Sequence, residues 1–97
     1  MSIQDRAVTW HTNRFPDAAK DDVLLKAVSE IGEVSDAMIA DNSPNPAHPE
    51  RAGNVLAESA DVVVCLLILC GRYGYGDLIA ATEEKLSVLE KRLYDKN

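Results

Sequence analysis

Apolar residues recur every three or four positions along most of this chain, which is the spacing of amphipathic α-helices. The first such pattern predicts a short helix from Ser2 to about Asn13, with Ile3, Ala7 and Trp10 on one face. We expect this helix to stop near Phe15, because a residue that precedes a proline avoids the α region.

A second, longer helix is predicted after a turn at Asp17–Lys20. Asp21 or Asp22 is placed to cap its first turn, where a carboxylate meets unpaired backbone amides. Its apolar residues fall on one stripe that we expect to be buried: Leu24, Ala27, Ile31, Val34 and Met38.

The stretch from Asp41 to Pro49 contains three prolines and two asparagines, a composition that predicts a surface loop. A third helix is predicted to begin near Pro49 or Glu50, since proline is tolerated in a first turn. This helix is apolar on nearly every side from Ala60 to Cys70, so we expect it to be the central and most buried one. The glycine-rich segment from 71 to 76 ends it.

A fourth helix is predicted from a cap at Asp77 almost to the C-terminus. Its apolar stripe alternates steps of three and four: Ile79, Thr82, Leu86, Leu89 and Leu93. The sequence has no strand pattern, repeat or low-complexity tract. Residues 1–97 are therefore predicted to form a single all-α domain of four helices, in which the second and third helices form a central antiparallel pair.

The length of the chain indicates that this domain does not bury all of its apolar faces alone. A domain of 97 residues buries only about 60 to 65% of the surface that its unfolded chain exposes. Four short helices, each with an apolar stripe, leave some faces uncovered. We therefore expect self-association.

Charge and cysteine content limit the partners and the compartment. The 16 acidic residues outnumber the 10 basic ones, and the net charge of -6 repels nucleic-acid backbones and anionic membranes. Cys65 and Cys70 point to separate sides of one helical run, so they cannot pair with each other and are expected to be small core residues. The first ten residues lack the features of a signal peptide, and the apolar run Val62–Cys70 is too short for a membrane span. We expect a cytoplasmic protein that binds neither nucleic acid nor membranes.

Two pairs of carboxylates are the most informative chemical feature of the sequence. Glu30 and Glu33 lie in the second predicted helix, and Glu58 and Asp61 lie in the third. Residues three apart are neighbours on a helix surface, with Cβ atoms about 5 to 6 Å apart, so each pair could share one cation. Glu30 and Glu33 lie away from the apolar stripe, and periodicity leaves open whether they are ligands or solvated charges.

The Glu58–Asp61 pair is expected to face protein, because it lies on the same side of the third helix as Cys65 and Leu69. Burying unpaired carboxylates costs several kcal/mol per ion, so such a pair requires a positive partner. A metal ion is one candidate, and oxygen-only ligands favour Mg²⁺, with Mn²⁺ as the alternative, over zinc. The other candidates are the basic residues Lys26, Arg72, Lys85 and Arg92.

Four features follow one another along the chain: the run Lys26-Ala-Val-Ser-Glu-Ile-Gly-Glu-Val, the run Glu58-Ser-Ala-Asp61-Val, a Tyr73-Gly74 turn, and a last helix with Lys85. Together they resemble the MazG-like, all-α nucleoside triphosphate pyrophosphohydrolases over roughly residues 24 to 92, most specifically in the paired carboxylates. The resemblance implies a four-helix MazG-like bundle completed by oligomerisation as a homodimer or homotetramer. It also implies that four carboxylates bind Mg²⁺: Glu30, Glu33, Glu58 and Asp61.

The reaction that this resemblance implies is the hydrolysis of a (deoxy)nucleoside triphosphate to the monophosphate and pyrophosphate, which serves to clean or regulate the nucleotide pool. Bound Mg²⁺ would neutralise the triphosphate oxygens and activate a water, with Glu33 as the expected catalytic base. Many family members have a glutamate where Ser29 stands and an asparagine where Leu89 stands. The first change should leave metal binding intact, whereas the second leaves a phosphate or sugar contact open.

Several further residues are candidates for contact with the nucleoside triphosphate. Trp10 could stack on a base, although burial statistics favour a core position for a lone tryptophan. Cationic side chains could bind phosphates: Lys26, Lys85 and Arg92. The sequence does not select one nucleotide, because base selectivity depends on the shape of the pocket.

A second class of function stays open. The chain could be a non-catalytic helical interaction or regulatory module, in which the acidic pairs make ion pairs with lysines and arginines of a partner. The expected burial of Glu58 and Asp61 argues against this alternative.

Overall fold

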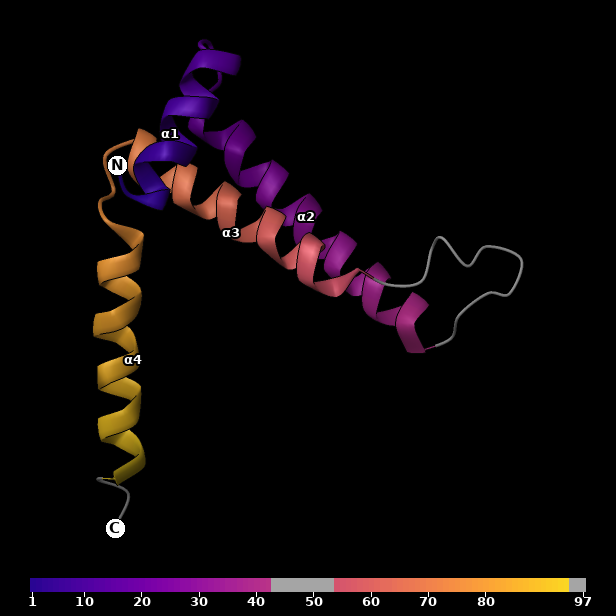
Figure 1. The fold of residues 1–97 in the computed structure, drawn as a ribbon, viewed down its shortest axis with the longest axis vertical. Coiled ribbons are helices and arrows are strands. Elements are labelled where there is room, and N and C mark those ends of the chain that lie inside the picture. Colours follow the sequence, from indigo (N-terminus) through magenta and orange to yellow (C-terminus); the bar gives the residue numbers. More distant parts are fainter. Residues whose placement is uncertain (43–53, 95–97) are drawn as a thin grey trace.

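A computed structural model describes residues 1–42 and 54–94, and this part of the chain contains helices and no strands, which confirms the all-α prediction. Figure 1 shows α2 and α3 side by side as an antiparallel pair, with α1 packed against the end of α3. The helices are α1 (Ile3–Arg14), α2 (Lys20–Asn42), α3 (Val55–Arg72) and α4 (Leu78–Tyr94).

Polar side chains fix the beginnings of three of these helices. Ser2 accepts a hydrogen bond from the Asp5 amide at 3.0 Å, and Asn54 accepts one from the Ala57 amide at 3.2 Å. Asp77 Oδ1 accepts the Ala80 amide proton at 3.0 Å, so the predicted cap of α4 is confirmed.

Two predicted helix starts have a different outcome. α2 begins at Lys20, so Asp21 and Asp22 lie in its first turn and do not cap it. The described part of α3 begins at Val55, and the predicted start near Pro49 or Glu50 falls outside the described residues.

Gln4 joins α1 to the connection between α3 and α4. Its amide nitrogen donates to the Leu67 and Gly76 carbonyls at 3.1 and 3.0 Å, and its amide oxygen accepts from the Leu78 amide at 3.0 Å. The two helices approach closely here, since a Cβ on Gly71 would lie 2.7 Å from Val8 Cγ2. Gly71 is therefore needed for the contact between α1 and α3.

The buried core of the chain is small and lies between α2 and α3. Its hydrophobic members are Val23, Ala27, Ala37, Leu67 and Ile68. The predicted buried stripe of α2 is wrong at three of five positions in this chain, because Leu24, Ile31 and Met38 are exposed. The smaller residues of α2 face α3, which allows close packing and leaves the larger apolar residues on the outer face.

The prediction that α3 is buried on nearly every side is also wrong for the described chain. Only Leu67 and Ile68 are fully buried on α3, whereas Val63 and Val64 are exposed. The physical reason is visible in Figure 1, where α4 extends away from the other helices and does not cover α3. The two cysteines are half-buried and free.

α4 extends away from the α2–α3 pair, so its apolar stripe is exposed to solvent. The radius of gyration is 16.8 Å, compared with about 13 Å for a compact domain of this length. Ile79, Leu86, Leu89 and Leu93 are all exposed on α4. The four-helix bundle is therefore not closed within one chain. None of the helices in the two described ranges is long and apolar enough to cross a membrane.

Candidate acidic site

The four carboxylates singled out in the sequence come together between α2 and α3. One oxygen from each of them lies within 4.8 Å of the corresponding oxygens of the others. The i, i+3 spacing places both members of a pair on one helix face, and the antiparallel packing of α2 against α3 turns the two pairs toward each other. The cluster consists of Glu30, Glu33, Glu58 and Asp61.

Burial within this cluster differs in part from the expectation. Glu30 is only 6% exposed, although the sequence left its burial open. Glu58 is half-buried with one buried oxygen, whereas Asp61 is exposed, so the expected burial of this second pair is wrong for Asp61.

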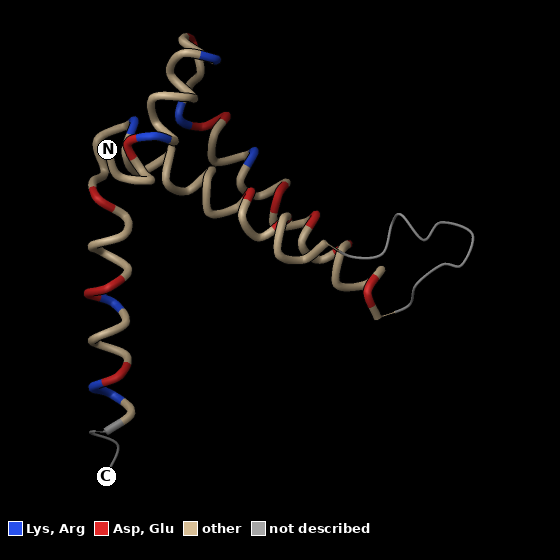
Figure 2. Tube along the Cα trace, in the orientation of Figure 1, with Lys and Arg blue, Asp and Glu red and all other residues tan. Residues whose placement is uncertain are grey.

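The described chain supplies little positive charge to the cluster. Lys26 Nζ lies 3.0 Å from Glu30 Oε1, but the Lys26 side chain is 63% exposed, so water screens this ion pair. Among the described residues, Glu30 Oε2 and Glu58 Oε2 are buried and have no hydrogen-bond partner. Among the described residues of α2 and α3 that follow Lys26 in the sequence, the only basic one is Arg72, as Figure 2 shows.

The remaining candidate cations lie elsewhere. Arg72 donates to the Phe15 and Pro16 carbonyls at 2.8 Å, and its guanidinium lies 2.8 Å from His11 Nδ1. Lys85 and Arg92 lie on α4, which this chain does not bring to the cluster. Arg72 is therefore not the partner of the four carboxylates.

The pKa values of two cluster members move in opposite directions. The hydrogen bond from Lys26 lowers the pKa of Glu30, and burial opposes this shift. Interaction with the carboxylates of Glu30 and then Glu58, together with burial, raises the pKa of Glu33. Glu33 thus holds a proton at a higher pH than an ordinary glutamate does. A cation that binds here would displace this proton, so its affinity should fall as the pH is lowered.

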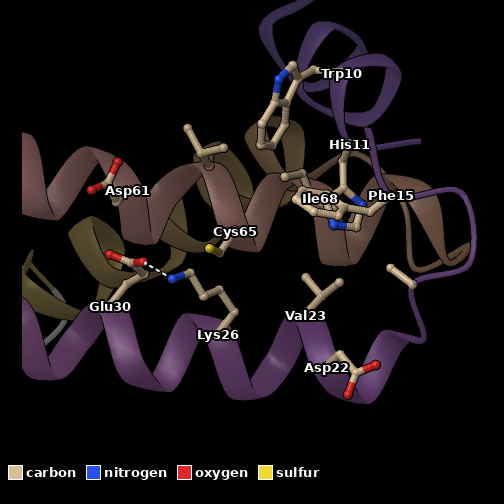
Figure 3. Close-up of a pocket in the computed structure, with 12 residues that line it drawn as sticks. Trp10, His11, Phe15, Asp22, Val23, Lys26, Glu30, Asp61, Cys65 and Ile68 are labelled. Atoms are coloured by element: carbon tan, nitrogen blue, oxygen red, sulfur yellow. Dashed lines mark ion pairs between the residues drawn. The ribbon is translucent and has the colours of Figure 1, made fainter. Parts of the chain in front are cut away.

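A cavity of about 540 Å³ extends from the acidic cluster to a group of aromatic side chains. Figure 3 shows Glu30 and Asp61 at one end, Lys26 beside them, and the rings at the other end. The walls between the two ends are partly apolar and include Val23, Cys65 and Ile68. The volume is in the range of known small-molecule sites.

The aromatic end consists of Trp10, His11 and Phe15, which we call the aromatic group. The Trp10 and Phe15 rings meet edge to face with centroids 6.0 Å apart, and the His11 and Phe15 centroids are 5.4 Å apart. Phe15 was not a candidate from the sequence, and His11, as a lone histidine, was expected to be a polar surface group, whereas it is buried. Their i, i+4 spacing at the end of α1 is the signal that could have found them.

The preferred core position of Trp10 is wrong for the described chain. Its side chain is 55% exposed and forms part of the cavity wall. α1 packs on α3 through Gln4 and Val8, which leaves Trp10 on the rim. The indole is thus accessible to a ligand in the cavity.

If the cavity binds a nucleotide, as the MazG-like resemblance implies, Trp10→Ala should weaken that binding while leaving the melting temperature close to that of the parent. Stacking of an aromatic ring on a base contributes about 1 to 3 kcal/mol, which corresponds to a loss of roughly 5-fold to 150-fold in affinity. Calorimetric titration and thermal melting measure the two effects. Ile3→Ala, an exposed apolar truncation on the same helix, is the matched control. A large fall in melting temperature with unchanged affinity would show that Trp10 is a core residue and does not contact the ligand.

The two positions at which the chain departs from the MazG-like pattern, Ser29 and Leu89, are both exposed. The resemblance to that family rests on the sequence motifs quoted above. No family model, curated protein or solved structure matches this chain.

Proposed function

We propose that this protein is a Mg²⁺-dependent nucleoside triphosphate pyrophosphohydrolase of the MazG-like type, which releases a nucleoside monophosphate and pyrophosphate. The observation that supports this proposal most is the state of the carboxylate cluster. It contains two buried oxygens, on Glu30 and Glu58, that have no hydrogen-bond partner in the described chain. Such groups are costly unless a positive partner is supplied.

The donor set fits a hard divalent cation. All four groups of the cluster are carboxylates, which are the ligands that Mg²⁺ and Mn²⁺ prefer. Lys26 supplies a single positive charge on one side of Glu30 and leaves Glu30 Oε2 unpaired. The residues that would hold the cation are Glu30, Glu33, Glu58 and Asp61.

The cavity gives this chemistry a place for a nucleotide. A triphosphate near the carboxylates would put the base toward the aromatic group, where Trp10 can stack on it. Lys26 lies beside the acidic end and can contact a phosphate oxygen. A cation held by these carboxylates would supply positive charge to phosphate oxygens and would ease the deprotonation of water. Glu33 is the proposed acceptor of the water proton, because it is the exposed glutamate of the cluster.

We propose that the working form is a homo-oligomer, a homodimer or a homotetramer. Two exposed apolar stripes support this proposal, one on the outer face of α2 and one on α4. The stripe on α2 includes Leu24, Val28, Ile31 and Met38, and the stripe on α4 includes Ile79, Leu86, Leu89 and Leu93. A second copy could cover both stripes and could bring Lys85 or Arg92 to the partner's cavity.

The same exposed stripes favour a second candidate function, a non-catalytic interaction or regulatory module. In that case the stripes would bind a partner and the acidic cluster would pair with the partner's cations. The two functions differ in turnover, so an activity assay separates them.

Incubation with each (d)NTP and Mg²⁺ should yield the monophosphate and pyrophosphate. The MazG-like resemblance implies attack of water at the α-phosphorus, and phosphorus NMR of the reaction mixture identifies the products directly. Orthophosphate and a diphosphate as the first products would refute this reaction. No turnover of any nucleotide would favour the interaction module.

A further inference from the structure

Arg72 and His11 form a contact that the proposed reaction does not explain. The guanidinium nitrogen Nη1 of Arg72 lies 2.8 Å from His11 Nδ1. The same guanidinium donates to the Phe15 and Pro16 carbonyls, both at 2.8 Å, so α3 holds it in place against the end of α1. His11 is only 9% exposed.

The chemistry of the two groups fixes the tautomer of the histidine. A guanidinium can only donate hydrogen bonds, because arginine stays protonated in proteins. His11 Nδ1 must therefore be the acceptor and carry no proton. A neutral imidazole with a free Nδ1 carries its proton on Nε2.

The His11 Nε2–H group forms no hydrogen bond with any other described residue. The His11 ring forms part of the cavity wall beside Trp10 and Phe15. This end of the cavity is the one distant from the carboxylate cluster. The charged groups around it are Arg72 on α3 and, in the walls of the same cavity, Asp22 and Lys26 on α2. Burial and then the charge of Arg72 lower the pKa of His11 and so favour its neutral form.

We infer two linked roles for this contact. Arg72 is a positioning residue that holds His11 as the Nε2–H tautomer. His11 then donates a hydrogen bond from Nε2 to an acceptor atom of a ligand ring that binds at the aromatic group. The ligand class is a planar heterocycle with a carbonyl oxygen on its edge. This inference deepens the proposed function, because it takes the bound heterocycle to be the base of the nucleotide.

The tautomer is measured without any ligand or turnover. Imidazole nitrogen NMR of ¹⁵N-labelled protein distinguishes a protonated from an unprotonated Nδ1, and His48→Gln removes the signals of the only other histidine. At pH 7 the His11 Nδ1 signal should be that of an unprotonated nitrogen. Arg72→Met should raise the pKa of His11 and mix the tautomers, whereas Arg72→Lys retains a cationic donor. A protonated Nδ1 in the parent would overturn the inference whether or not Arg72→Met folds.

The donor role is tested by equilibrium binding. Trp10 is the only tryptophan and borders the cavity, so its fluorescence reports a bound ligand. Ca²⁺ replaces Mg²⁺ in these titrations so that binding is measured without turnover. Two pairs of nucleotides differ at one carbonyl and at the ring N–H beside it: inosine triphosphate with purine riboside triphosphate, and uridine triphosphate with its 4-deoxo analogue. The carbonyl member of at least one pair should bind about tenfold more tightly, the size of one neutral hydrogen bond.

His11→Phe keeps an aromatic ring and removes the donor, so the preference should fall to about onefold in this variant. His11→Gln retains an amide donor near the Nε2 position and should recover part of the preference. Equal affinity within both pairs, or an unchanged preference in His11→Phe, would overturn the donor role. Because binding is measured without turnover, a protein that shows this preference but hydrolyses nothing would refute the proposed reaction alone.

Discussion

Asp61→Asn should lower the rate of nucleotide hydrolysis by about 100-fold or more, while leaving the metal-free protein as stable as the parent or more stable. A bound cation contributes several kcal/mol of charge stabilisation to the reaction, and Asp61 is one of its four proposed ligands. Without metal, the four carboxylates repel one another, so removal of one charge relieves this repulsion. The variant should also lose most of the stabilisation that Mg²⁺ gives the parent, about 2.7 kcal/mol at 100 times the dissociation constant.

Melting curves in EDTA and in excess Mg²⁺ measure both effects on stability. Asp36→Asn removes the same charge from an exposed position of α2 outside the cluster, and it should keep both the Mg²⁺ shift and the turnover. A clear loss of stability of Asp61→Asn in EDTA, with no Mg²⁺ shift in the parent, would show that Asp61 belongs to an ion-pair network. That result would remove the basis of the catalytic proposal.

Leu86→Lys should convert the proposed oligomer into a monomer at micromolar concentration. Leu86 is 55% exposed in the single chain and lies within the apolar stripe of α4. Burial of one leucine contributes about 1.5 to 3 kcal/mol, and a symmetric dimer contains the substitution twice. The dissociation constant should therefore rise by about 10² to 10⁴.

Analytical ultracentrifugation of the parent and the variant measures this change. Val88→Lys also replaces an apolar residue of α4 by a cation, but on the opposite side of the helix from the stripe. This control should remain associated. A monomeric parent at micromolar concentration would count against self-association altogether.

Helical periodicity was sufficient to predict four helices, although capping residues located only some of their starts. Asp77 is an example, because its short carboxylate accepts the Ala80 amide proton at the start of α4 as predicted. The convergence of the four carboxylates was also predictable, since it needs only the i, i+3 spacing and the antiparallel pairing of α2 with α3.

Burial was less predictable than the helices themselves, because it depends on how the helices pack. Periodicity places Leu24 and Ala27 on the same broad side of α2, but only packing decides that Ala27 faces α3 and that Leu24 faces outward. Glu30 is buried for the same reason, although its type favours exposure. The contact between Arg72 and His11 joins residues from α3 and α1, so no local pattern indicated it.

The position of α4 was the least predictable part of the fold. Its stripe of apolar residues indicates a buried face, and the chain itself offers no partner for that face among the described residues. Lys85 and Arg92 lie on this helix, so a single chain does not bring them to the acidic cluster. Their predicted role in phosphate binding depends on a second copy of the chain.

The most direct test of the metal site is anomalous X-ray scattering from crystals grown with Mn²⁺ in place of Mg²⁺. Data collected just above the manganese absorption edge locate the ion without reference to activity. We expect a peak in the anomalous difference map between Glu30, Glu33, Glu58 and Asp61, within bonding distance of the oxygens that have no partner in the described chain. An empty cluster at saturating Mn²⁺, with density only at other acidic groups, would contradict the proposed metal centre.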